Sequence, residues 1–286
     1  MVAGAASRDV TADDPRGWRL GGAAAYCSLT AARLGLRVGC VLGVDKAAAG
    51  ANELAALEAA GVSLRLVELD HGPVFENLES GGHRRQRWLS RSDAVPAAAL
   101  PAEWRAAAGW LLVPVAGELG SDWEVAASTA ALGGARVGVG WQGLLRRLDH
   151  DGSVEKVEPG PSPLLDAAGL VVASLDDVGR NDTIEELWRL APRATMVLTA
   201  GEGGGIAMRD GVLRRYRAVS AENPVDPTGA GDVFLAALLT AWLMTGEVGT
   251  AATLRFAAAA ASCVVEGVGL AGVPSRTEVA SRLGAG

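Results

Sequence analysis

The chain has 286 residues, of which 49% are hydrophobic and 21% charged, so it can bury a substantial core and is not a disordered chain. Its formal net charge is -7, and its arginines come in scattered pairs, which argues against nucleic-acid binding and against binding to an anionic membrane surface. The cysteines and histidines show no disulfide framework and no zinc-site spacing. We find no signal-peptide pattern, and the most apolar run, 233–244, is too short to span a bilayer; we therefore expect a cytoplasmic protein.

Short apolar runs alternate along the chain with alanine-rich segments of helical periodicity. Helices are predicted over 23–34 and 47–60, and each is followed by a glycine that can end it. The other predicted elements are strands at 38–43, 110–115, 135–140, 169–173 and 195–199, and helices at 123–132 and 184–190. This alternation predicts an α/β fold in a single domain of residues 1–286: a doubly wound, mostly parallel sheet with helices on both faces.

One segment departs from this alternation. Residues 62–91 read as strands without a helix, and 74–79 and 83–89 have the pattern of a hairpin that turns at 80–82. Polar and apolar residues alternate along it, so one face should be solvated. We predict that 62–91 form a small β lid, with 10–20 as a further candidate. The alternative is a surface hairpin without a role in the site.

A glycine-rich turn, Gly229-Ala230-Gly231, stands directly before Asp232 and a broadly apolar helix. Small residues let a backbone approach a ligand closely, and the free N–H groups at a helix start attract an anion. Asp232 then has two interpretations: a charge that caps the helix, or a general base that takes a proton from a hydroxyl group while the amides hold a phosphoryl group. No lysine follows the glycines, so the turn is not a Walker P-loop, and the dinucleotide fingerprint is absent from the first strand.

The run D-P-T-G-A-G-D at 226–232 resembles the C-terminal signature of the PfkB/ribokinase-type carbohydrate kinase family. Further segments resemble this family in the order of the chain: 4–9, which ends at the predicted substrate-binding aspartate; 21–26 leading to 31–35; 43–45; 199–204; and 255–261. The resemblance covers nearly the whole chain. It implies a ribokinase-like fold with a small β lid.

The resemblance also implies an activity and a set of site residues. The chain would use ATP and Mg²⁺ to phosphorylate a hydroxyl group of a small sugar or cyclitol, with Asp232 as general base. The anion hole would consist of the amides of Gly229, Ala230 and Gly231. The substrate would be bound by Asp9, Gly21, Gly22 and Tyr26. ATP would be bound by Thr199, Gly201, Glu202, Gly203, Gly204 and Ala258.

Three positions depart from the family's pattern. Tyr26 stands where many sugar kinases have asparagine, and it would either hydrogen-bond a ring hydroxyl or simply pack. Ser174 and Asp177 stand in place of the N-x-x-E motif and would support Mg²⁺ through water; a helix N-cap is the alternative. Asp226 resembles part of a monovalent-cation site, so K⁺ is a further candidate.

Other features bear on the substrate and the partners. The hairpin and the run from Gln142 to Arg146 look more like the inositol-kinase-like branch. Strand ends in an open α/β sheet share one edge, which should bring Asp9, Glu118, Gln142, Thr199 and the glycine turn toward one crevice. The alternatives are a nucleoside kinase of the same fold and a non-catalytic binder of sugar or nucleotide. The expected partners are a small polyhydroxylated substrate and, through the lid, a second copy of the chain.

Overall fold

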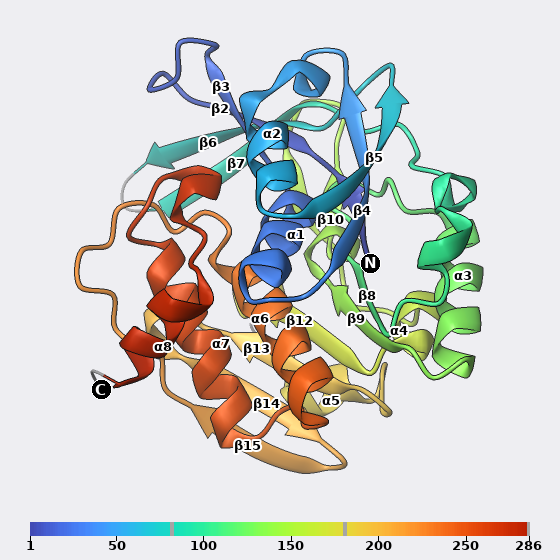
Figure 1. Cartoon of the computed structure of the whole chain (residues 1–286), viewed down its shortest axis with the longest axis vertical. Coiled ribbons are helices and arrows are strands. Elements are labelled where there is room, and N and C mark those ends of the chain that lie inside the picture. Colours follow the sequence, from blue (N-terminus) through green and yellow to red (C-terminus); the bar gives the residue numbers. More distant parts are fainter. Residues whose placement is uncertain (81–82, 180–181, 285–286) are drawn as a thin grey trace.

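The computed structural model describes residues 1–80, 83–179 and 182–284. A nine-stranded sheet forms its centre, in the order β15-β14-β13-β12-β9-β8-β1-β4-β5 (Figure 1). The strands are β1 (Val2–Ala5), β4 (Val38–Asp45), β5 (Val62–Leu69), β8 (Gly109–Leu112), β9 (Arg136–Gly140), β12 (Leu170–Ser174), β13 (Thr195–Thr199), β14 (Gly205–Arg209) and β15 (Val212–Tyr216). Neighbours pair in parallel from β5 to β13, whereas β14 and β15 are antiparallel. The predicted mostly parallel sheet is confirmed.

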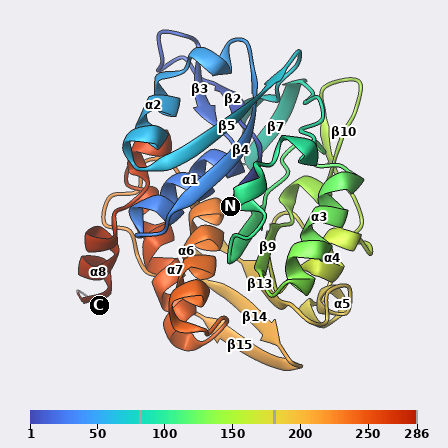
Figure 2. The ribbon, with the colours of Figure 1, turned by 45° about the vertical axis from the view of Figure 1, so that its right-hand side comes forward.

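Helices cover both faces of this sheet (Figure 2). One hydrophobic layer contains residues of α1 (Ala23–Arg33), α2 (Asn52–Ala59), α6 (Ala230–Thr245), α7 (Ala251–Val264) and α8 (Arg276–Gly284). The opposite layer contains residues of α3 (Ser121–Leu132), α4 (Pro163–Ala167) and α5 (Ile184–Trp188). Successive side chains of β8 alternate between the layers, with Leu111 in the first and Leu112 in the second, as a strand buried on both faces requires. Within the described part of the chain, no helix has the length and apolar character needed to cross a membrane.

A second sheet has four strands in the order β3-β2-β6-β7. They are β2 (Ser7–Val10), β3 (Trp18–Gly21), β6 (Val74–Ser80) and β7 (His83–Ser90), and we call them the small sheet. The predicted lid, residues 62–91, is only partly part of this small sheet. Its first residues, 62–69, instead form β5, the edge strand of the central sheet, parallel to β4. An edge strand keeps solvated positions, so its polar–apolar pattern resembles that of a lid strand. Residues 81–82 of the predicted hairpin turn lie outside the described residues.

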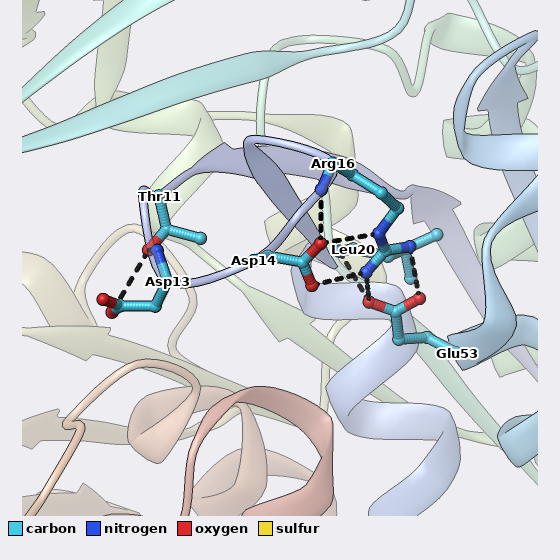
Figure 3. A network of polar contacts seen from close by, with 6 residues as sticks. All are labelled: Thr11, Asp13, Asp14, Arg16, Leu20 and Glu53. Carbon is cyan, nitrogen blue, oxygen red and sulfur yellow. Dashed lines mark hydrogen bonds and ion pairs between the residues drawn. The ribbon is translucent and has the colours of Figure 1, made fainter.

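The loop between β2 and β3 is fixed to α2 by an ion-pair network (Figure 3). The Arg16 guanidinium contacts the carboxylates of Asp14, at 2.9 Å, and Glu53, at 2.6 Å. Glu53 also accepts a hydrogen bond of 3.2 Å from the backbone N–H of Leu20 on β3. The Glu53 carboxylate on α2, a helix packed on the central sheet, therefore holds both the β2–β3 loop and strand β3 of the small sheet.

The other end of the small sheet is joined to a hairpin of β10 (Arg146–Leu148) and β11 (Val154–Lys156). Arg87 on β7 forms an antiparallel bridge with Ser153, and the Trp88 N–H donates to the carbonyl of Gly152 at 3.1 Å. The Trp88 indole N–H donates to the Ser153 carbonyl at 3.0 Å. The chain after β9 therefore covers the edge of β7.

Candidate active site

The glycine turn before α6 is packed against Tyr26. Gly229 is the N-cap of α6 and has a φ of 82°, in the left-handed region that favours glycine. A Cβ atom on Gly229 would lie 2.3 Å from Cε1 of Tyr26, so a side chain has no room there. A Cβ atom on Gly231, by contrast, would meet only open space. The turn is therefore closed on its Tyr26 side and open beside Gly231.

The start of α6 presents backbone N–H groups to this open space. Val233 donates the first intrahelical hydrogen bond, to the Gly229 carbonyl at 2.9 Å. Helix geometry leaves the preceding N–H groups of Gly231 and Asp232 without an intrahelical acceptor. The Ala230 N–H donates to the Pro227 carbonyl at 3.2 Å, so the predicted anion hole has one member that is already bonded within the turn. The positive end of the helix dipole points the same way, and an anion is favoured here.

Asp232 lies in the first turn of α6 and is partly buried. Burial raises the pKa of its carboxyl group from 3.8 to about 7. The positive charge of Arg146 opposes this rise in pKa, while the negative charges of Asp9 and Asp177 add to it. A carboxylate with a pKa near 7 is a stronger proton acceptor than an ordinary aspartate, and about half of the molecules carry it in the ionised form at neutral pH.

Asp9, predicted to bind substrate, lies on β2 directly over Gly21. The Ser7 hydroxyl donates to Asp9 Oδ1 at 2.8 Å, and a Cβ atom on Gly21 would come within 2.3 Å of Asp9 Oδ2. Gly22 has a φ of 94°, and a Cβ there would meet the Ala5 carbonyl at 2.6 Å. Gly21 therefore leaves room for the Asp9 carboxylate, and Gly22 lets the start of α1 pass close to the backbone that follows β1. The structure brings Asp9, Gly21 and Gly22 together, on the side of the small sheet.

Tyr26 is 2% exposed and lies close enough to the acidic groups of the site to feel their charge. Burial raises the pKa of its hydroxyl group, and the charges of Asp9, Asp226 and Asp232 raise it further. The hydroxyl oxygen lies 4.0 Å from the position of a Cβ on Gly269. Of the two interpretations of Tyr26, packing is therefore observed directly, through its ring against Gly229.

Asp226 ties the glycine turn to the loop after α7. Its Oδ1 accepts from the Thr228 N–H at 2.9 Å, and its Oδ2 from the Gly269 N–H at 3.4 Å. Its own N–H donates to the Val265 carbonyl at 3.0 Å. The predicted monovalent-cation ligand thus has a clear structural function in fixing the backbone beneath the anion site.

The predicted nucleotide loop follows β13. Thr199 ends that strand, and its hydroxyl donates to the Ala173 carbonyl at 3.3 Å. The loop then forms a 3-10 turn over Gly201–Gly203 and closes with a hydrogen bond from the Ala200 N–H to the Gly204 carbonyl. Gly201, Glu202 and Gly203 are exposed, whereas Ala258 is 6% exposed, within α7. Ala258 is therefore largely buried in the core and has no hydrogen-bonding side chain.

Ser174 and Asp177, predicted to support Mg²⁺, are both engaged in other contacts. The Ser174 hydroxyl accepts from the Asp176 N–H at 3.1 Å, in a turn rather than a helix N-cap. Asp177 is 6% exposed, and its Oδ1 lies 2.7 Å from Nη2 of Arg146. The described residues contain no cluster of three or more His, Cys, Asp or Glu side chains suited to a metal ion.

Arg146 is a site residue that the sequence reasoning missed. Its Nη1 donates to Gln86 Oε1 of the small sheet at 2.7 Å, while its Nη2 contacts Asp177 on the loop after β12. It follows a 3-10 turn over Gln142–Leu144, in which Gly143 packs so closely that a Cβ atom would lie 2.1 Å from the Pro114 carbonyl oxygen. The run Q-G-L-L-R contained the signal: a polar residue at a strand end, a glycine for close packing, and an arginine after the turn.

Glu118, expected at the crevice, is instead a buried anchor. It is 1% exposed and accepts hydrogen bonds from the backbone N–H groups of Ala5, at 3.0 Å, Val115, at 3.1 Å, and Ala116, at 2.8 Å. Burial raises the pKa of this carboxyl group, and the backbone donors act in the opposite direction. Glu118 therefore joins the ends of β1 and β8 and stabilises the edge on which the site is built.

Comparison with known proteins agrees with the sequence motifs. The model of the pfkB family of carbohydrate kinases matches residues 168–277, which include the nucleotide loop, the glycine turn and Asp232. The predicted resemblance is confirmed for this part of the chain. No curated protein sequence matches the chain.

Solved structures match the chain over nearly its full length. A pyrophosphate-dependent kinase of the ribokinase family, in complex with a pyrophosphate analogue and myo-inositol, is 17% identical, with a TM-score of 0.76 over 98% of this chain and 100% of that one. Arabidopsis thaliana ribokinase with ribose and ATP is 21% identical, with a TM-score of 0.72 over 99% and 97%. A Methanocaldococcus jannaschii nucleoside kinase is 16% identical, with a TM-score of 0.72 over 100% and 98%. The chain therefore has the ribokinase fold.

Proposed function

We propose that the chain is an ATP-dependent kinase that phosphorylates a hydroxyl group of a small sugar or cyclitol. The observation that carries this proposal is Asp232: a carboxyl group with a pKa near 7, next to the open N-terminus of α6 and facing the charge of Asp9. A phosphoryl group on the α6 amides and a hydroxyl group near Asp9 would both lie beside this base. The family match over 168–277 and the ribokinase fold support the same reaction class.

The proposed reaction is a direct transfer. Asp232 takes the proton of the acceptor hydroxyl, whose oxygen forms the new bond to the γ-phosphorus. The bond from that phosphorus to the bridging oxygen breaks, and ADP leaves with the electron pair. The amides of Gly229, Ala230 and Gly231 and the dipole of α6 stabilise the charge on the transferring group, with Gly231 the most accessible donor. Positioning, rather than covalent catalysis, supplies the rate acceleration.

The protein side chains do not fit a preformed magnesium site. Mg²⁺ prefers several oxygen ligands in octahedral geometry, but Ser174 is bonded in its own turn and Asp177 pairs with Arg146. We therefore expect Mg²⁺ to enter bound to the phosphates of ATP, with a water-mediated contact to Ser174, whereas Asp177 stays paired with Arg146. We assign it no step of its own.

Pyrophosphate is a second candidate donor. A solved structure of similar fold is a pyrophosphate-dependent kinase, and Ala258 offers no polar side chain to a base. The proposed ATP contacts at Thr199, Gly201, Glu202, Gly203, Gly204 and Ala258 would matter for a nucleotide and much less for pyrophosphate. Both donors therefore belong in the first assay.

The decisive experiment measures ADP release from Mg·ATP, and phosphate release from Mg·pyrophosphate, with sugars, inositols and nucleosides as acceptors. Asp232→Asn is assayed beside the wild type. Turnover with one acceptor class that collapses in Asp232→Asn supports the proposal and names the class; a nucleoside would select the nucleoside-kinase alternative. Ligand-induced thermal stabilisation without turnover points to a non-catalytic binder. Wild-type turnover in Asp232→Asn rejects the mechanism.

Tyr26 and Asp9, with the Gly21 and Gly22 backbone, are the proposed acceptor contacts. A monovalent cation such as K⁺ is proposed near Asp226, and it would be tested by comparing turnover in potassium and tetramethylammonium salts.

A homodimer through the small sheet is also proposed. The edge of β7 is covered by residues 152–153 of the same chain, so the pairing would use β3 or a face of the sheet. A monomer mass by light scattering across a wide concentration range would contradict the dimer.

A further inference from the structure

The side chain of Arg146 joins the two sides of the candidate active site. On one side it contacts Gln86 of β7, in the small sheet that also carries Asp9. On the other side it contacts Asp177, in the loop between β12 and the helix that follows. Ser174, at the end of β12, is the register partner of Thr199 in the nucleotide loop. Arg146 therefore stands between the proposed acceptor side and the proposed donor side.

This arginine is fixed rather than mobile on the surface. Its side chain is 19% exposed, and that of Asp177 is 8% exposed. Two of its N–H groups are used by Gln86 and Asp177, and a guanidinium group carries further donors in the same plane. Such a fork is suited to the oxygens of a phosphoryl group. The adjacent Arg147 differs, because it is 61% exposed and pairs with Asp149 and Glu155 within the β10–β11 hairpin.

The geometry points to Arg146 as the side-chain cation that contacts the transferring phosphoryl group, with Gln86 and Asp177 as the residues that position it. This inference rests on the proposed kinase function. The Arg146 guanidinium contacts Gln86 on the small sheet and Asp177 on the loop after β12, and its charge acts on Asp232. It therefore lies where the phosphoryl group would pass from donor to acceptor. Asp177, predicted to support a metal ion, then acts through the arginine instead. The bond from Gln86 makes the arginine's position depend on the placement of the small sheet.

The first test measures binding, so it does not require turnover. We would titrate the full-length protein with inorganic pyrophosphate, without an acceptor, in the wild type, Arg146→Met, Arg146→Lys and Arg147→Met. We expect Arg146→Met to weaken pyrophosphate binding about tenfold or more, Arg146→Lys to recover part of this loss, and Arg147→Met to match the wild type. Equal affinity in the wild type and Arg146→Met would overturn the inference. Thermal unfolding of each variant shows that the folded proteins are being compared.

The second test uses the acceptor found for the wild type. Removal of an arginine that stabilises a transferring phosphoryl group lowers kcat by about a thousandfold, with a smaller change in the acceptor KM. A purely structural Arg146 would instead change stability and acceptor KM and leave pyrophosphate affinity unchanged. Should Arg146→Met fail to fold, Arg146→Lys and Gln86→Met provide the same comparison. Unchanged kcat in both of these variants would then overturn the inference.

The pH profile separates the positioning and metal roles of Asp177. Asp9, Asp177 and Arg146 are the charged groups that act on Asp232. Removal of the arginine's charge should move the Asp232 ionisation to higher pH, and Asp177→Asn should move it to lower pH. A metal role predicts a higher requirement for Mg²⁺ in Asp177→Asn with normal pyrophosphate binding in the absence of metal, and that result would overturn the positioning role. If the wild type turns over no acceptor yet binds pyrophosphate through Arg146, the proposed function fails and the phosphate site remains.

Discussion

The ring of Tyr26 lies directly against the backbone of Gly229, so that any Cβ at position 229 would sit 2.3 Å from Cε1 of the tyrosine. An aromatic residue of α1 thereby sets the path of the turn that precedes α6. We expect Gly229→Ala to lose most activity, because the φ of 82° costs an alanine about 1–2 kcal/mol and the clash adds to it. Turnover and urea unfolding of the purified variant measure the two effects.

The same contact can be tested by a double-mutant cycle. Tyr26→Ala should lower the free energy of unfolding by about 3–5 kcal/mol, as expected for a buried aromatic residue. In that background Gly229→Ala should cost less, since the clash is gone and only the backbone strain remains. Tyr26→Phe keeps the ring and should keep most of the stability. A raised acceptor KM in Tyr26→Phe would show that the hydroxyl group also binds substrate, whereas additive losses in the cycle would contradict the contact.

Asp232 should give the proposed kinase activity a distinctive pH dependence. Its pKa is raised from 3.8 to about 7, mainly by burial, and only the ionised carboxylate can accept the hydroxyl proton. We therefore expect kcat/KM to rise with pH and to level off above about pH 7. Asp232→Asn should lose this rise and about a hundredfold or more in rate. A profile that levels off already near pH 4 would contradict the raised pKa.

The same shift predicts an opposite effect on stability. The folded state binds the Asp232 proton more tightly than the unfolded chain does, so this residue's contribution to the free energy of unfolding falls as the pH rises from about 4 to about 7. Asp232→Asn removes the ionisation. The variant should therefore gain stability relative to the wild type as the pH rises, which unfolding curves at pH 5 and pH 8 would measure. A constant difference between the two proteins would contradict the linkage.

The sequence predicted the parts of this fold that have strong local patterns. Alternation of apolar strands and alanine-rich helices indicated the parallel sheet, and the D-P-T-G-A-G-D run placed Asp232 in the first turn of a buried helix. The pattern of residues 62–69 predicts a lid strand, but these residues form β5 of the central sheet, because an edge strand with one solvated face has the same polar–apolar pattern as a lid strand. Strand partners depend on contacts distant in sequence, which a local pattern does not contain.

Arg146 and Glu118 show the same limit for side chains. Both were visible as charged residues after apolar strands, but their partners lie far away in the chain: Gln86 and Asp177 for the arginine, and the Ala5 amide for the glutamate. Glu118 is structural because it is buried against backbone donors. Arg146 lies between the small sheet and the loop after β12, which suits it to the proposed contact with the phosphoryl group. Only the fold distinguishes these two outcomes.

The ion pair between Arg16 and Glu53 should anchor the small sheet. Glu53→Gln keeps an acceptor for the Leu20 N–H but removes the charge, and we expect a loss of about 0.2–1 kcal/mol in the free energy of unfolding. Burial opposes ionisation of Glu53, but the hydrogen bonds from Arg16 and the backbone outweigh it and lower the pKa below 4.5. The stabilisation is therefore present above pH 4.5 and disappears as the pH falls through the lower, folded-state pKa.

Glu58→Gln, at an exposed position of the same helix, is the matched control for this ion pair. If the small sheet closes over the acceptor, Glu53→Gln should also raise the acceptor KM, and Glu58→Gln should leave it unchanged. Equal unfolding curves and equal acceptor KM values for the two variants would show that the network in Figure 3 has no anchoring function.

Gly143 should matter because it lets the chain before Arg146 pass close to the Pro114 carbonyl. A Cβ at Gly143 would lie 2.1 Å from that oxygen. The contact is with backbone rather than with a flexible side chain, so it can be relieved only by displacing the main chain. We expect Gly143→Ala to lower the free energy of unfolding by about 1–3 kcal/mol and to weaken pyrophosphate binding by displacing Arg146. Gly50→Ala is the control, because a Cβ there meets open space and the backbone φ is ordinary. That variant should change stability by less than about 0.5 kcal/mol. If Gly143→Ala lost stability but bound pyrophosphate normally, the turn would support the fold without positioning Arg146, since the strain would then be absorbed before it reached the guanidinium.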